Sequence, residues 1–284
     1  MSPLHGLRSC VDNSRLRTYL PALRMFSTLG RLALSFIQYL GELALLFAET
    51  IHAIFAAPIR WRLLLRQVVE IGFRSQLVVA VTGGFTGAVM AAQTYFQFHR
   101  LGMDSAVGAV VSVSMFRELG PVLTGLMVSG RVGAAIAAEI GTMKVTEQID
   151  ALRALGVYPI DYLVVPRVLA MMISMPLLVG ESVGLALIAS NFVGTNVLGV
   201  SSAYYQHQTV LYTDSSDIIM ALTKGFFFAI LIAFIACHQG LNTKNGAVGV
   251  GRAPTEAVVI SSLAILISNF FLSFALNIFF PGGV

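Results

Sequence analysis

Five stretches of this chain are apolar for long enough to cross a lipid bilayer as helices, and this constrains the fold more than any other feature. The hydrocarbon core of a bilayer is about 30 Å thick and takes about 20 residues of α-helix. The predicted spans cover residues 71–93, 107–128, 163–199, 218–236 and 257–280. With 56% hydrophobic and 11% charged residues, the chain lacks the polar surface that a soluble domain needs. The sequence predicts an all-α integral membrane protein.

The third predicted span is too long for one straight crossing. As a helix, 37 residues measure about 55 Å, and Pro176 and four glycines interrupt residues 163–199. A kinked span that extends beyond the outer side and two shorter crossings both fit this pattern. Two pairs of glycines have the GxxxG spacing that allows helices to approach closely: Gly83 with Gly87, and Gly180 with Gly184.

The residues before the first span divide into two parts. Residues 1–27 form a basic N-terminal segment, and residues 28–284 form one membrane domain without a polar linker. Residues 32–57 are apolar except for one polar stripe at helical spacing, made of Ser35, Gln38, Glu42, Glu49 and His52. Such a helix favours the membrane interface. Pro58 and the arginines of residues 60–66 then predict an elbow that leads into the first span.

Basic residues are concentrated at the N-terminal end. Nine of the eighteen Lys and Arg residues precede Gln76, which predicts a cytoplasmic N-terminus by the positive-inside rule. Nucleic-acid binding is the competing interpretation of such a cluster. Arginines spaced among apolar residues beside membrane spans more simply bind anionic lipid headgroups, so no nucleic-acid partner is expected. Residues 201–217 contain no Lys or Arg, as expected for the outer side.

Arg117 and Glu118 lie near the middle of the second predicted span, where charge is costly and usually functional. Neighbouring residues on a helix point roughly 100° apart, so the two side chains cannot simply neutralise each other. Each needs another partner or water, which indicates a polar cavity inside the bundle. Lys224, near the outer end of the fourth span, is either such a partner or an interfacial lysine that reaches the membrane surface.

Residues 131–158 interrupt the apolar pattern and are typical of a short amphipathic helix in a cytoplasmic loop. Gly156 and Pro159 form its stop signal. A second cytoplasmic loop, rich in glycine, is predicted over residues 238–256.

Several kinds of chemistry have no motif in this sequence. No GxxxxGK[ST] phosphate loop occurs, so the chain is not expected to hydrolyse ATP by itself. The five histidines and two cysteines have no metal-ligand spacing, and Ser129 lacks a partner histidine. We therefore expect no enzyme activity, no cofactor and no metal.

Two segments carry a resemblance to a known family. They read RELGPVLTGLMVSGRVGAAIAAEIGTMKVTEQIDAL, from Arg117, and AVGVGRAPTEAVV, from Ala247. Both are similar to the MlaE/YrbE permeases, the membrane subunits of ABC-type lipid transporters that work with MCE-domain proteins. The resemblance extends from about Pro58 to the C-terminus.

This resemblance implies a multi-pass homodimer in the inner membrane, with an N-terminal interfacial helix, five transmembrane helices and a cytoplasmic coupling helix. It implies a lipid pocket at the dimer centre, a separate ATPase subunit, a periplasmic MCE partner and, in many members, a STAS-domain protein. By the same resemblance, Arg117, Glu118 and Lys224 would contact phospholipid or gate its pocket. The coupling helix over residues 139–155 would present Glu139, Lys144, Glu147, Asp150 and Arg153 to the ATPase.

The leading functional prediction is therefore a permease subunit that moves phospholipid or a related lipid between the inner membrane and a periplasmic MCE partner. One alternative is an ion- or proton-coupled secondary transporter, in which Arg117, Glu118, Glu181 and Lys224 form a relay. Another is a membrane anchor that only assembles other proteins.

Overall fold

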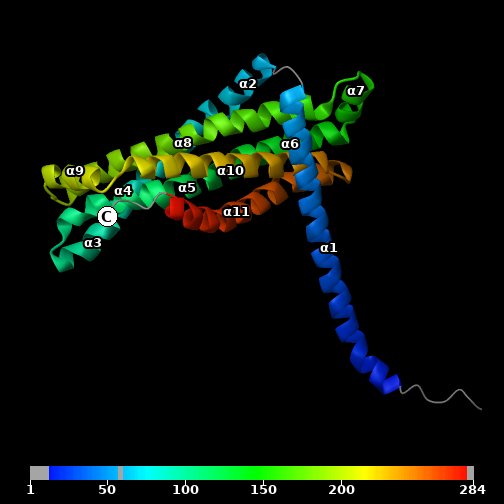
Figure 1. Ribbon diagram of the computed structural model, residues 1–284, viewed down its shortest axis with the longest axis horizontal. Coiled ribbons are helices and arrows are strands. Elements are labelled where there is room, and N and C mark those ends of the chain that lie inside the picture. The colour runs from blue at the N-terminus through cyan, green and yellow to red at the C-terminus, as the bar shows by residue number, and fades with distance from the viewer. Residues whose placement is uncertain (1–12, 57–59, 280–284) are drawn as a thin grey trace, which may run out of the picture. The chain divides into compact units, whose positions relative to one another are not determined.

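The computed structural model describes residues 13–56 and 60–279. Within these ranges every regular element is a helix (Figure 1). Six helical stretches of the described chain are long and apolar enough to cross a membrane. The prediction of an all-α membrane protein is thus confirmed. The chain divides after Phe47 into two units, each of which is described by itself.

The first unit contains most of helix α1, Asn13–Ala56. Residues 32–56 of the predicted interfacial helix lie within α1, but the helix starts about five turns earlier, and residue 57 lies outside the described residues. Its apolar part, Ile37–Ala56, also has the length and composition of a span, so its interfacial position stays a prediction. Residues 1–12 of the predicted N-terminal segment, and Pro58 in the predicted elbow, lie outside the described residues.

The second unit contains the end of α1 and all later helices. In chain order they are α2 (Trp61–Ile71), α3 (Gln76–Phe98), α4 (Val107–Ser114), α5 (Gly120–Val128), α6 (Ala134–Val145), α7 (Gln148–Ala154), α8 (Val165–Phe192), α9 (Ser202–Leu211), α10 (Ser215–Leu241) and α11 (Gly246–Phe279). Short π-helical turns join α4 to α5 and α5 to α6, so Val107–Val145 forms one helical stretch.

The helices are longer than the predicted spans. The second span was predicted to end at residue 128, whereas its helix continues to Val145 and measures about 58 Å, nearly twice the bilayer core. The predicted glycine-rich loop of residues 238–256 is wrong for most of its length. Only residues 242–245 lie between α10 and α11, because Gly246 and its successors form the first turns of α11. Residues 201–217 likewise contain α9 and the start of α10.

The third predicted span is one continuous helix. Residues Ile160–Val197 are helical throughout, and Pro176 lies inside α8 without ending it. A continuous helix rules out two shorter crossings, and the extension of a single kinked span beyond the outer side stays a prediction.

Glycines allow α3 and α8 to pack with little space between their backbones. A Cβ atom added at Gly83 would lie 2.5 Å from the carbonyl oxygen of Ser182, and one added at Gly87 would lie 2.2 Å from that of Ala186. The first GxxxG prediction is therefore confirmed. Nothing lies within 4 Å of such atoms at Gly180 and Gly184, so the described chain supplies no partner for the second.

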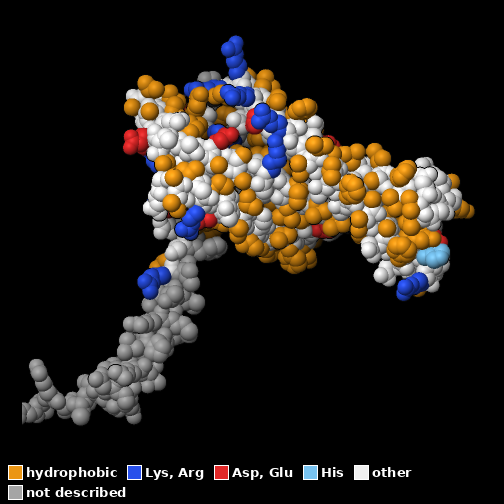
Figure 2. All heavy atoms as spheres, turned by 180° about the vertical axis from the view of Figure 1, so that it is seen from behind, with side chains coloured by type: hydrophobic (Ala, Val, Ile, Leu, Met, Phe, Trp, Pro, Cys, Tyr) orange, Lys and Arg blue, Asp and Glu red, His pale blue; other side chains and the backbone are white. Residues whose placement is uncertain are grey.

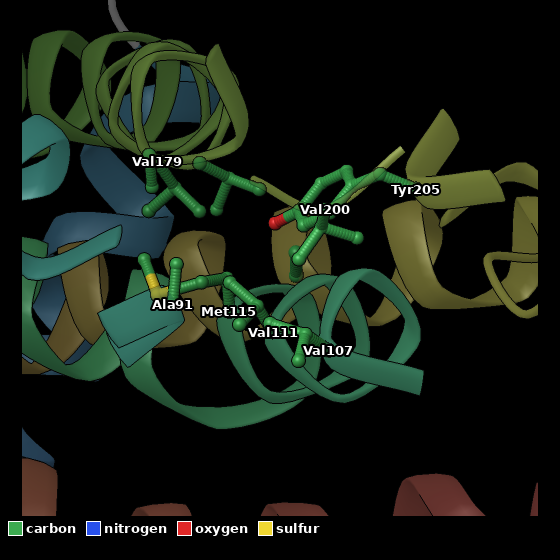
Figure 3. Packing of buried hydrophobic residues seen from close by; sticks show 10 residues of the cluster. Ala91, Val107, Val111, Met115, Val179, Val200 and Tyr205 are labelled. Carbon is green, nitrogen blue, oxygen red and sulfur yellow. The ribbon is translucent and has the colours of Figure 1, made fainter. Parts of the chain in front are cut away.

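A hydrophobic cluster joins α3, α4, α8, α9 and α10 near one end of the unit (Figure 3). Its members include Ala91, Val111, Met115, Val179 and Tyr205. This cluster holds the end of α4 just before the π-helical turn that carries Arg117 and Glu118, and thereby positions those two residues.

Replacing Gly87 by alanine is expected to destabilise the unit by about 1–3 kcal/mol, because the new methyl group would overlap the backbone of α8 at Ala186. Gly84→Ala is the matched control, since nothing lies within 4 Å of a Cβ atom at Gly84 on the same helix. The control is expected to be neutral or to stabilise slightly, because alanine favours helix over glycine. Unfolding in mixed detergent micelles measures the stability of both variants. Equal stability of the two would contradict the packing described for α3 and α8.

Candidate functional site

Arg117 and Glu118 are presented by the π-helical turn Met115–Leu119, between α4 and α5. Single π-helical turns often occur at functional sites. Pro121 follows in the first turn of α5 and has no N–H to donate to the carbonyl group of Arg117. The ammonium group of Lys224, on α10, donates to that carbonyl oxygen instead.

Glu118 and Lys224 form an ion pair. Lys224 Nζ lies 3.0 Å from Glu118 Oε1 and also donates to Ser273 Oγ, at 2.7 Å. Its three donors thus match three acceptors, and its side chain is only 2% exposed. The interpretation of Lys224 as an interfacial lysine is therefore wrong, because α10 begins nine residues earlier, at Ser215, and the Lys224 side chain is buried inside the bundle.

The carboxylate of Glu118 has further partners on α11. Ser273 Oγ donates to Oε1 at 2.7 Å, and Asn269 Nδ2 donates to Oε2 at 2.8 Å. In contrast to Lys224, the side chain of Glu118 is 45% exposed. One partner of the ion pair is therefore buried and the other lies at an open face.

Arg117 and Glu118 have different partners, as predicted for two neighbouring side chains that cannot neutralise each other. Its Nε lies 2.6 Å from Oδ1 of Asp217, and its Nη1 lies 3.5 Å from Oδ1 of Asn277. Asp217 is 1% exposed and also accepts the backbone N–H of Asp214 at the start of α10. The two residues form a capping box, which fixes the carboxylate that receives the arginine.

These contacts define one group of side chains, which we call the polar layer. It consists of Arg117, Glu118, Asp217, Lys224, Asn269, Ser273 and Asn277. Two cationic and two anionic side chains balance its charge. The layer lies among apolar helices and is open to the outside at Glu118.

Sequence reasoning missed four members of the polar layer, namely Asp217, Asn269, Ser273 and Asn277. Spacing is the signal that could have found them. Asp217 and Lys224 are seven residues apart, and the three polar residues of α11 follow one another at intervals of four. Both spacings place side chains on one face of a helix.

The residues predicted to contact an ATPase do not lie on one helix. Glu139 and Lys144 belong to α6, whereas Asp150 and Arg153 belong to α7. Glu147 lies between these helices with a left-handed φ of 59°. The predicted single helix over residues 139–155 is thus wrong, because this conformation, unfavourable for a residue with a side chain, ends the helical path.

Ion pairs hold this region together. Asp150 lies 3.3 Å from Arg153 and 3.6 Å from Lys144, which links α7 to the end of α6. Glu139 lies 2.9 Å from Arg167, a buried residue in the first turn of α8 that also donates to the carbonyl oxygen of Leu163. In the described part of the chain, no group of three or more His, Cys, Asp or Glu residues is arranged to hold a metal ion.

Comparison with known proteins identifies the family. A family model described as Permease MlaE matches residues 64–275. A protein of Rickettsia conorii named "Probable ABC transporter permease protein" is 45% identical over 249 residues, which are 87% of this chain and 95% of that protein. A protein of Synechocystis with the same description is 43% identical over 209 residues, or 74% of this chain and 80% of that protein.

A plant protein is also similar. "Protein TRIGALACTOSYLDIACYLGLYCEROL 1, chloroplastic" of Arabidopsis thaliana is 37% identical over 234 residues, which are 82% of this chain and 66% of that protein. The family match spans the region of α6 and α7 and every residue of the polar layer except Asn277. It confirms the resemblance drawn from the sequence, and the chain belongs to the MlaE family of ABC transporter permeases.

Proposed function

We propose that this permease moves phospholipid or a related lipid between the inner membrane and a periplasmic MCE partner, with ATP hydrolysed by a separate subunit. The observation that carries the proposal is the polar layer, where two ion pairs lie inside an apolar bundle and Glu118 remains half exposed. Such a layer fits a molecule with one polar end and long apolar chains. The name of the Arabidopsis relative contains that of a diacyl galactolipid, which supports a lipid as cargo.

The proposal assigns different tasks to the two ion pairs. Arg117, partly exposed beside Asp217, would donate to the phosphate or other oxygen atoms of a headgroup. Glu118 would accept from hydroxyl or amine groups of the headgroup, while Lys224 holds its carboxylate in place. The apolar side chains of α11 next to these residues, such as Leu266, Phe270 and Phe274, are exposed and would contact the acyl chains.

A homodimer is part of this proposal. Large exposed side chains follow α11 from Val259 to Phe279, on the same helix that contributes Asn269 and Ser273 to the polar layer. A second copy of the chain placed against α11 would enclose the open side of the layer. The lipid pocket would then lie between the two copies.

Charge distribution supports the proposed orientation. On the face of the second unit shown in Figure 2, Lys and Arg side chains gather toward the end that carries α2 and α7, and the middle is mostly hydrophobic. By the positive-inside rule this end and the N-terminus would be cytoplasmic. The region of α6 and α7 would contact the ATPase, the MCE protein would bind at the opposite end, and a STAS-domain protein is a further candidate partner.

Photo-crosslinking and transport in reconstituted vesicles test the proposal. With its ATPase and MCE partners, the permease is expected to crosslink a photoreactive phospholipid at the polar layer and to transfer labelled lipid only when ATP is present. Transfer of an ion without ATP, abolished by a protonophore, would instead support the secondary transporter. Absence of both bound lipid and transfer would indicate a membrane anchor.

A further inference from the structure

Helix α2 has an exposed apolar stripe that packing within the described chain does not explain. Its buried face, with Leu64 and Ile71, packs against the bundle, where α8 is the main neighbour. On another face, four large side chains are each more than half exposed: Trp61, Leu65, Val69 and, just beyond the helix, Phe73. They follow one another at intervals of four residues and form one continuous stripe.

A basic stripe lies directly beside the apolar one. Arg62 and Arg66 are exposed and one helical turn apart, and within the described residues neither forms an ion pair or a hydrogen bond. The neighbouring arginines differ in this respect. Arg74 pairs with Glu70, and the guanidinium group of Arg60 lies over the ring of Tyr162, 5.2 Å from its centroid. Arg62 and Arg66 therefore keep their charge available for an external anion.

Helix α2 comes directly before a helix that is long enough to cross the bilayer by itself. The helical stretch Trp61–Leu101 has 41 residues and measures about 60 Å, twice the thickness of the hydrocarbon core. Helix α3 alone, with 23 residues, is long enough to cross at about 35 Å. The residues of α2 are therefore not needed for the crossing, and they adjoin the end of α3 at which the crossing begins.

We propose that α2 is a docking surface for anionic lipid headgroups of the bilayer. The stripe of Trp61, Leu65, Val69 and Phe73 inserts at the boundary between headgroups and acyl chains. Arg62 and Arg66 bind the phosphates of acidic lipids beside it. An exposed apolar stripe next to unpaired cations is the pattern of helices that lie in an anionic membrane interface. This surface is separate from the polar layer and does not depend on which cargo the permease carries.

The fluorescence of Trp61 reports on this surface alone, because Trp61 is the single tryptophan of the chain. The full-length protein is reconstituted in vesicles of phosphatidylcholine with one fifth phosphatidylglycerol, and bromine is placed near the headgroup end of the acyl chains of one lipid at a time. At equal mole fraction of brominated lipid, phosphatidylglycerol is expected to quench Trp61 roughly twofold more strongly than phosphatidylcholine. High salt is expected to reduce this preference.

The variants R62Q and R66Q, combined, are expected to abolish the preference while Trp61 remains quenched by both lipids. R74Q is the matched control, because Arg74 is already paired with Glu70, and its preference is expected to match that of the unmodified protein. Equal quenching by both lipids in the unmodified protein would overturn the proposal. So would a preference that survives R62Q/R66Q, or no quenching by either lipid, which would place α2 against a protein partner. The measurement requires neither ATP nor transport, so its outcome is independent of the proposed function.

Discussion

Replacing Glu118 by alanine is expected to lower the free energy of unfolding by about 3 kcal/mol or more, because the ammonium group of Lys224 would lose its counter-charge while remaining almost fully buried. Lipid transport is expected to fall about tenfold or further, since a charge-assisted contact to the headgroup would also be lost. Lys224→Met is expected to destabilise less. The glutamate that it leaves behind is 45% exposed and can be hydrated.

The double variant Glu118→Ala with Lys224→Met separates structure from function. Replacing both partners of a buried ion pair by apolar groups is often nearly neutral for stability, so the double variant is expected to regain most of the stability lost by Glu118→Ala. Transport is expected to stay low. Unfolding in detergent micelles and vesicle transport assays give the two readouts. Recovery of transport together with stability would show that the pair only orients α10 against the π-helical turn.

Replacing Arg117 by leucine is expected to have the second large effect, again about 3 kcal/mol or more. Asp217 is 1% exposed and would remain as a buried carboxylate without its cation. Adding Asp217→Asn is expected to restore much of the stability, because asparagine keeps an oxygen for the N–H of Asp214 and carries no charge. Transport is expected to remain low in both variants, since neither can donate from a guanidinium group to a headgroup.

Arg74→Gln serves as the control for the loss of an arginine from an ion pair. Its partner Glu70 is one turn away, and both side chains are well exposed. Such a pair contributes little, so a change within about 0.5 kcal/mol is expected. Thermal unfolding of the three variants is sufficient for the comparison. If Arg117→Leu were as mild as the control, the buried pair with Asp217 would not stabilise the bundle.

The fold was predictable where hydropathy alone decides and less so where helices leave the membrane. Hydropathy located five of the six long apolar helices of the described chain, because the bilayer requires long apolar runs. It placed several ends too early. Residues 134–145 and 246–256 mix small, apolar and polar side chains. The sequence suggested a separate amphipathic helix that includes most of the first segment, and a loop for the second. In the structure both segments belong to longer helices. Helix α6 packs against α10 and α11, with Gly141 fitted against Thr243 and Gly240 fitted against Ile140.

The candidate site was predictable only through its rarest residues. Arg117 and Glu118 stand out because charge is unusual in an apolar run, and Lys224 could be suspected for the same reason. Asp217 was hidden in a polar stretch that resembled an ordinary loop. Asn269 and Ser273 were missed because single neutral polar residues are common in membrane helices, and only their regular spacing marks them.

The glycine contacts between α3 and α8 have a mechanical consequence. Because the backbones of α3 and α8 are in contact at Gly83 and Gly87, the two helices cannot slide or tilt independently. They are expected to move together as one rigid body. Within one chain, helix α11 has five buried residues among 34, whereas α8 has 14 among 28. In a conformational cycle, any displacement of α11 relative to α3 and α8 would break and re-form the bonds of Asn269 and Ser273 to Glu118.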